Sequence, residues 1–69
     1  MEIKYDKEAD AVYIEFGKGE FAKNQKLNDF TILDLDKKGN IIGIEILDAK
    51  KRISARSLTS IKNSIALTN

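Results

Sequence analysis

Four short stretches of this chain alternate between apolar and polar side chains, and this period of two constrains the fold more than any other feature. The stretches cover residues 1–5, 12–16, 31–36 and 41–47. Because successive side chains of a strand point to opposite faces of a sheet, the alternation predicts strands with one apolar face. A fifth stretch, residues 21–28, is more polar and contains lysines, so we expect it at an edge of the sheet.

Turn residues separate these stretches. Residues 17–20, 28–29 and 37–40 lie between consecutive strands and are rich in Gly, Asn and Asp. These residue types favour the tight connections of hairpins. The loop of the first hairpin, residues 6–11, is longer and acidic. Together the strands and turns predict a five-stranded antiparallel meander, in which each strand pairs with the next one in the sequence.

The apolar faces of the strands also predict a register. Leu33 lies opposite Ile44, because a slip of one residue would turn the apolar side chains of one strand to the other face. The same reasoning pairs Leu35 with Ile42, Thr31 with Ile46, Tyr5 with Val12, Ile3 with Ile14 and Met1 with Phe16.

After Asp48 the period changes to that of a helix. Leu58, Ile61 and Ile65 recur at spacings of three and four residues, which predicts an amphipathic helix with one apolar stripe. We therefore expect an α+β protein. Residues 1–53 form the antiparallel β-meander, and residues 54–69 form a C-terminal helix that packs on one face of the sheet.

Ile53 does not lie on the apolar stripe of that helix. The sequence therefore predicts a break near residues 52–56 and a short first turn at residues 49–52, with Asp48 as its cap. A serine hydroxyl accepts a hydrogen bond from a free amide in the first turn of a helix, so either Ser54 or Ser57 is expected to cap the main helix.

A single helix covers only one face of such a sheet, and the other face carries apolar side chains among three acids, Glu15, Asp34 and Glu45. An open apolar cluster on a small chain is typical of an interface, and a small core gains stability from oligomerisation. We expect this chain to bind itself, as a homodimer or a larger assembly. The expected interface residues are Tyr13, Phe30, Ile32, Ile41 and Leu47.

Charge divides the chain into two parts. All eleven acidic residues and seven of the twelve basic ones lie in residues 1–48, and the remaining five basic residues follow. This basic tail is expected to fold back on its own acidic sheet or on that of a neighbouring copy. Nucleic-acid binding is not expected, because the charges are few and no aromatic stacking platform accompanies them. The candidate residues of the tail are Arg52, Arg56 and Lys62.

Composition argues against most catalytic chemistry. The 69 residues include no Cys and no His, so thiolate nucleophiles and the commonest general base and metal ligand are missing. Three carboxylates, Asp6, Glu8 and Asp10, share one loop, and a metal-binding protein or hydrolase built on them is the alternative function. Asp6 and Asp10 more simply accept backbone amides in a turn. No catalytic residue, metal site or cofactor is predicted.

A calcium-loop pattern also occurs, with Asp34, Asp36 and Glu45 at its acidic positions. Lys38 stands where an oxygen ligand belongs, and the flanking segments are strands. Gly39 is better explained by the left-handed conformation of a hairpin turn. The N-terminal residues are too charged for a signal peptide and no apolar run approaches the roughly 20 residues of a membrane helix, so we expect a cytoplasmic protein.

Residues 5–14, 31–36 and 39–49 resemble a family of small prokaryotic proteins, domain of unknown function 2283. The resemblance covers about residues 1–53. It implies no established activity, and it implies a small toxin-like protein as a partner, with this chain as the antitoxin. The sequence as a whole predicts a non-catalytic, homo-oligomeric, protein-binding module.

Overall fold

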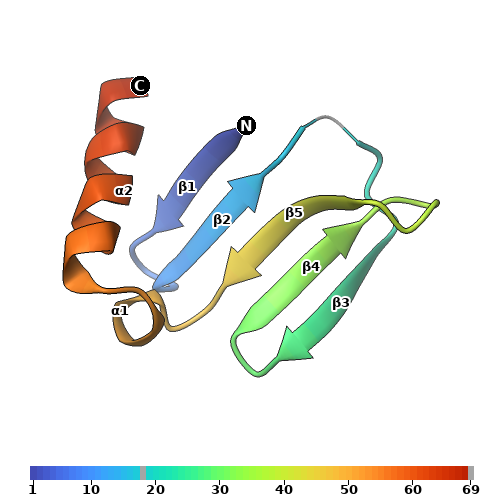
Figure 1. Ribbon diagram of the computed structural model, residues 1–69, viewed down its shortest axis with the longest axis horizontal. Helices are drawn as coiled ribbons and strands as arrows, with labels where there is room; N and C mark the ends of the chain where they lie inside the picture. The colour runs from blue at the N-terminus through green and yellow to red at the C-terminus, as the bar shows by residue number, and fades with distance from the viewer. Residues whose placement is uncertain (18, 69) are drawn as a thin grey trace.

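The computed structural model describes residues 1–17 and 19–68, with the side chains of residues 64–68 left out of the description. Within these residues the chain forms one antiparallel sheet followed by two helical segments (Figure 1). The strands are β1 (Glu2–Asp6), β2 (Ala11–Glu15), β3 (Lys23–Asn28), β4 (Thr31–Leu35) and β5 (Ile41–Ile46), and the helices are α1 (Ala49–Arg52) and α2 (Ala55–Thr68).

The five strands are those that the sequence predicts, but their order is not that of a meander. The order is β1-β2-β5-β4-β3, so β2 pairs with β5, and β3, the next strand along the chain after β2, lies at the far edge. The apolar β5 thereby gains a neighbour on both sides. Every residue of β3 is exposed, and this polar strand forms an edge, which confirms the prediction for it.

The predicted registers are confirmed over most of both hairpins. Leu33 pairs with Ile44, and Thr31 pairs with Ile46. A register shift follows Asp34, so Leu35 lies opposite Ile41 instead of the predicted Ile42. The extra residue on β5 is a β-bulge, which strict alternation cannot anticipate. In the first hairpin, Ile3 pairs with Ile14 and Tyr5 with Val12, as predicted, and the pairing ends at Glu2 and Glu15 before it reaches Met1 and Phe16.

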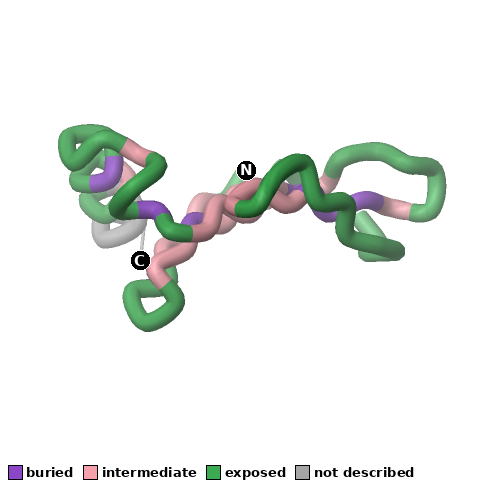
Figure 2. Tube along the Cα trace, turned by 90° about the horizontal axis from the view of Figure 1, so that it is seen from below, coloured by how far each residue is buried: buried purple, intermediate pink, exposed green. Residues whose placement is uncertain are grey.

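The core lies between α2 and the β1–β2 end of the sheet. Val12, Ala49 and Leu58 are buried there, and half-buried apolar residues of the sheet pack around them. The helical segments lie on one side of the sheet at this end (Figure 2). Leu58 and the half-buried Ile61 occupy the predicted apolar stripe, whereas the side chain of Ile65 lies outside the described residues. No helix in residues 1–17 and 19–68 is long and apolar enough to cross a membrane.

The helical segment breaks where the sequence predicts, at Ile53 and Ser54 between α1 and α2. The Ser54 hydroxyl accepts a hydrogen bond from the Ser57 amide at 3.1 Å, so Ser54 caps α2. Asp48 lies at the N-cap position of α1, as predicted, but its side chain makes no cap hydrogen bond. Its backbone is left-handed, with φ of 52°. The carboxylate of Asp10, from the β1–β2 turn, instead accepts from the Lys50 amide at 3.2 Å.

Leu33→Ala should lower the free energy of unfolding by about 2–5 kcal/mol, because it removes a buried side chain from the middle of the sheet. Glu8→Ala, in the exposed β1–β2 turn, is the control and should change stability by less than about 0.5 kcal/mol. Urea denaturation followed by circular dichroism measures both. A large loss in the Glu8 variant with none in the Leu33 variant would contradict the assignment of the core.

Candidate functional site

The face of the sheet opposite α2, here called the second face, carries a continuous row of side chains across all five strands. Cα pairing links Lys4 to Tyr13, Tyr13 to Glu45, Glu45 to Ile32 and Ile32 to Lys26. Because directly paired residues of antiparallel strands point to the same face, these five side chains form one line, here called the central row. The row has a cation at each end, a carboxyl group at the centre and an apolar or aromatic side chain between.

A hydrogen bond crosses the middle strand of this face. The Tyr13 hydroxyl on β2 donates to Asp34 Oδ2 on β4 at 2.8 Å, although β5 lies between the two strands. Gly43 of β5 makes the crossing possible, because a Cβ atom there would lie 2.8 Å from the Tyr13 hydroxyl oxygen. A glycine at this position therefore serves the close approach of a side chain rather than a turn.

Asp34 is buried beneath the second face, with 5% of its surface exposed. Its Oδ2 accepts from Tyr13, while its Oδ1 is buried and has no hydrogen-bond partner among the described residues. Glu45 neighbours it. Burial, followed by the proximity and charge of the Asp34 carboxylate, raises the pKa of Glu45.

The Asp34 carboxylate also shifts the pKa of Tyr13. The hydrogen bond to Asp34, with burial next in importance, raises the pKa of Tyr13 to about 12. Tyr13 therefore stays protonated and remains a donor at any physiological pH. Tyr13, Asp34 and Glu45 together form a linked polar group at the centre of the second face.

Four of the five predicted interface residues lie on or at the end of this face and are half-buried. Ile32 and Tyr13 belong to the central row. The Leu47 amide donates to the Phe30 carbonyl at 2.8 Å, which continues the β4–β5 register one step further. Ile41 is different, since the register shift sets it opposite Leu35, whose side chain points away from the second face. With 47% of its surface exposed, Ile41 is not part of the cluster.

Two hollows border the Tyr13 ring. One, of about 360 Å³, is lined by Lys4, Glu45 and Leu47 together with residues of the β1–β2 turn. The other, of about 310 Å³, lies toward Glu15 and Phe21. Second-face side chains form part of the lining of both hollows, so this face is not flat beside Tyr13.

The acidic loop has a structural role. Asp6 Oδ1 accepts from the amides of Glu8 and Ala9 at 3.0 and 3.1 Å. Asp10 accepts from the Tyr5 hydroxyl at 2.9 Å, and its carbonyl accepts from the Ala49 amide. Asp6 thus closes its own turn, and Asp10 fastens that turn to α1. This matches the simpler interpretation of the two aspartates.

The calcium-loop pattern does not form a loop. Asp36 directs both oxygens into its own turn, accepting from the Lys38 amide and from Asn40. Gly39 has the left-handed conformation expected of it, with φ of 86°. Asp34 and Glu45 lie on the sheet beyond this turn. In the part of the chain that the structure describes, no three Asp or Glu residues are grouped to hold a metal ion.

Two of the three candidate cations of the basic tail lie over aromatic rings of their own chain. The Arg52 guanidinium lies 3.9 Å from the centre of the Phe30 ring, and Lys62 Nζ lies 4.8 Å from that of Tyr5. Cation–π contacts of this kind favour docking of the tail on its own sheet. Arg56 is exposed on α2.

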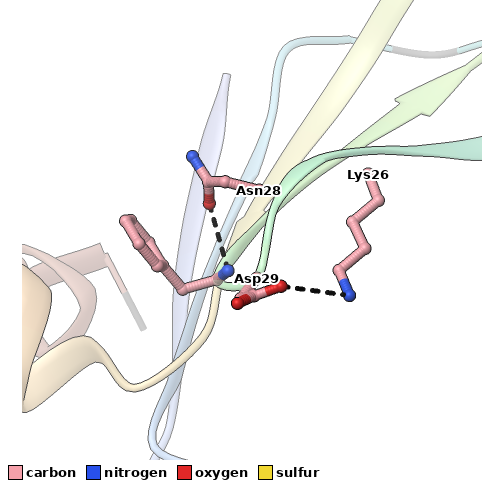
Figure 3. A network of polar contacts seen from close by, with 4 residues as sticks. Lys26, Asn28 and Asp29 are labelled. Atoms are coloured by element: carbon pink, nitrogen blue, oxygen red, sulfur yellow. Dashed lines mark hydrogen bonds and ion pairs between the residues drawn. The ribbon is translucent and has the colours of Figure 1, made fainter.

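The β3–β4 turn holds the outer end of the central row. Asn28 Oδ1 accepts from the Phe30 amide at 3.0 Å, and Lys26 Nζ lies 3.6 Å from Asp29 Oδ1 (Figure 3). The Asp29 side chain is fully exposed and that of Lys26 is 64% exposed. An exposed pair of this kind contributes little to stability, so Lys26 is free to exchange Asp29 for another carboxylate.

Sequence reasoning placed Asp34 and Glu45 on the second face but missed their link to Tyr13 and the two lysines of the central row. The sequence already shows that these polar residues alternate with the apolar ones on that face. Their link can be read only when β2 is known to pair with β5, and the meander order hides that pairing.

The family comparison agrees with the resemblance seen in the sequence. The model of a family described as "Protein of unknown function (DUF2283)" matches residues 2–50, which span all five strands. Searches of curated proteins and of solved structures gave no match.

Tyr13→Phe should lower the free energy of unfolding by about 1–3 kcal/mol, because Oδ2 of the buried Asp34 would lose the hydrogen bond that it accepts from Tyr13. Urea denaturation of the two proteins at neutral pH measures this loss. A difference below about 0.5 kcal/mol would show that the hydrogen bond across β5 does not stabilise the sheet.

Glu45→Gln should change how stability depends on pH. The folded state raises the pKa of Glu45 above its ordinary value of 4.5, so the native chain binds this proton more tightly than the unfolded chain does. The stability that the folded state gains from this tighter proton binding is fully present below the ordinary pKa and is lost as pH rises through the raised pKa. As pH rises between these two pKa values, the native protein should lose stability relative to the Gln variant. Urea denaturation in dilute solution measures this loss. Parallel pH profiles would contradict the assignment.

Proposed function

The chain belongs to this family, whose description names no activity, and we propose that it is a non-catalytic protein-binding module that pairs with a second copy of itself through the second face. The main support for this proposal is that α2 and the core lie on only one of the two faces of the sheet. The helix α2 packs against β1 around the core residues Val12 and Leu58. On the other face Ile32 and Leu47 are half-buried, and Arg52 of α1 lies over the Phe30 ring.

The small core supports self-association. Only Val12, Leu33, Leu35, Ala49 and Leu58 are buried apolar residues among those described, and Val12 is the one large side chain with no exposed surface. A domain of this length is marginally stable on its own. Covering a further apolar surface with a second copy adds burial without lengthening the chain.

The polar residues favour binding over catalysis. Asp6 and Asp10, on which a hydrolase would have to be built, already accept hydrogen bonds from the turn, from Tyr5 and from α1. On the second face, the Asp34 carboxylate is held by Tyr13 beneath the surface. Fixed charges set among apolar side chains are typical of a surface that selects a partner.

Light scattering and sedimentation of the native chain at micromolar concentration should give the mass of a dimer or a larger assembly. Ile32→Glu should give a single chain that keeps its strand signal in circular dichroism, because it puts a charge in the middle of the second face. Ile41→Glu is the matched control, since Ile41 lies outside the cluster, and should leave the assembly intact. A native protein with the mass of one chain would refute the proposal.

A further inference from the structure

The central row restricts how a second copy can lie on the second face. From one edge to the other it reads Lys4, Tyr13, Glu45, Ile32, Lys26. Neighbouring strands are about 4.8 Å apart, so the carboxyl group at the centre lies about 10 Å from the lysine at either end. The charges thus repeat with a spacing of two strands.

Two identical faces that stack about a twofold axis parallel to the strands bring each row over its own copy in reverse. An axis along β5 sets Glu45 on Glu45 and Lys4 on Lys26, so every charge in the row meets a like charge. An axis that runs across the strands sets each residue on itself, with the same result. Like charges directly opposed disfavour both arrangements.

We propose that the second copy binds about a twofold axis that runs along β4 through Ile32, so that Lys26 of each copy pairs with Glu45 of the other. This inference rests on the proposed function and specifies its geometry. Ile32 then packs on Ile32 at the axis, between two symmetric ion pairs. Phe30, at the end of β4, also lies near the axis, with the Arg52 guanidinium of its own chain over its ring.

Lys26 and Glu45 are both suited to form an ion pair between the two copies. Lys26 is mostly exposed and has only the fully exposed Asp29 as a neighbour, at 3.6 Å. Glu45 stands beside the buried Asp34, which makes its ionised form unfavourable in a single copy. The ammonium group of the second copy offsets that charge. Sheets that pack face to face lie about 10 Å apart, a gap that a lysine and a glutamate span together.

Asp34 also comes close to its own copy in this arrangement, because it is on β4. Asp34 is 95% buried within its own chain and accepts from the Tyr13 hydroxyl, so its charge is compensated by a donor of its own chain. The corresponding axis along β2 would pair Lys4 with Glu45. It would also oppose the half-buried Glu15 to its own copy, and would leave Phe30 and Ile32 away from the axis.

Charge reversal tests this geometry. Lys26→Glu alone and Glu45→Lys alone should each weaken dimerisation roughly tenfold or more, because each opposes like charges at both pairs. An equimolar mixture of the two variants should recover a dimer that contains one copy of each, since both pairs are then opposite in charge. Lys4→Glu reverses the matching lysine at the other end of the row and should leave the dimer unchanged. Sedimentation velocity and native mass spectrometry measure the affinities and the composition.

The outcomes separate the arrangement from the function. A native dimer that survives both single reversals would overturn the β4 axis while leaving self-association in place. Loss of the dimer in the Lys4 variant but not in the Lys26 variant would move the axis to β2 and overturn the inference. Failure of the mixed variants to pair, with both still folded by circular dichroism, would also overturn it. A native protein that is monomeric would refute the proposed function itself.

Discussion

The hydrogen bond from the Tyr13 hydroxyl to Asp34 is the interaction on which the second face depends. It joins β2 to β4 across β5, and only a glycine at position 43 leaves room for it. By fixing the Asp34 carboxylate beneath the surface, it also sets the environment of Glu45, whose charge lies at the middle of the central row. The polarity of the face thus follows from one contact between strands that are not neighbours.

The difference between the two faces has a separate origin in the β1–β2 turn. Asp10 accepts from Tyr5 and from the first amides of α1, so it ties the turn to the start of the helical segment. That link directs α2 toward the face that carries Val12, where Leu58 is buried. On the opposite face α2 gives no such cover to Ile32 and Leu47, which are half-buried.

Local patterns predicted the fold further than they predicted the site. Alternation located four of the five strands and most of the register, since each hairpin needs only neighbouring sequence. It failed on the strand order, because residues 17–20 have the composition of a hairpin turn although β2 and β3 are not neighbours in the sheet. It also failed on the cap of α1, because Asp10 and Lys50 are 40 residues apart. Ile41 was misplaced by a bulge that alternation cannot show.

The central claim is that a second copy covers the second face. An isotope-filtered nuclear Overhauser experiment on an equimolar mixture of labelled and unlabelled chains tests it most directly. The account predicts contacts between copies from the Ile32 methyl groups to Ile32 and Phe30 of the other chain. Contacts between copies that involve only apolar side chains away from this face, such as Phe16 and Met1, would contradict it.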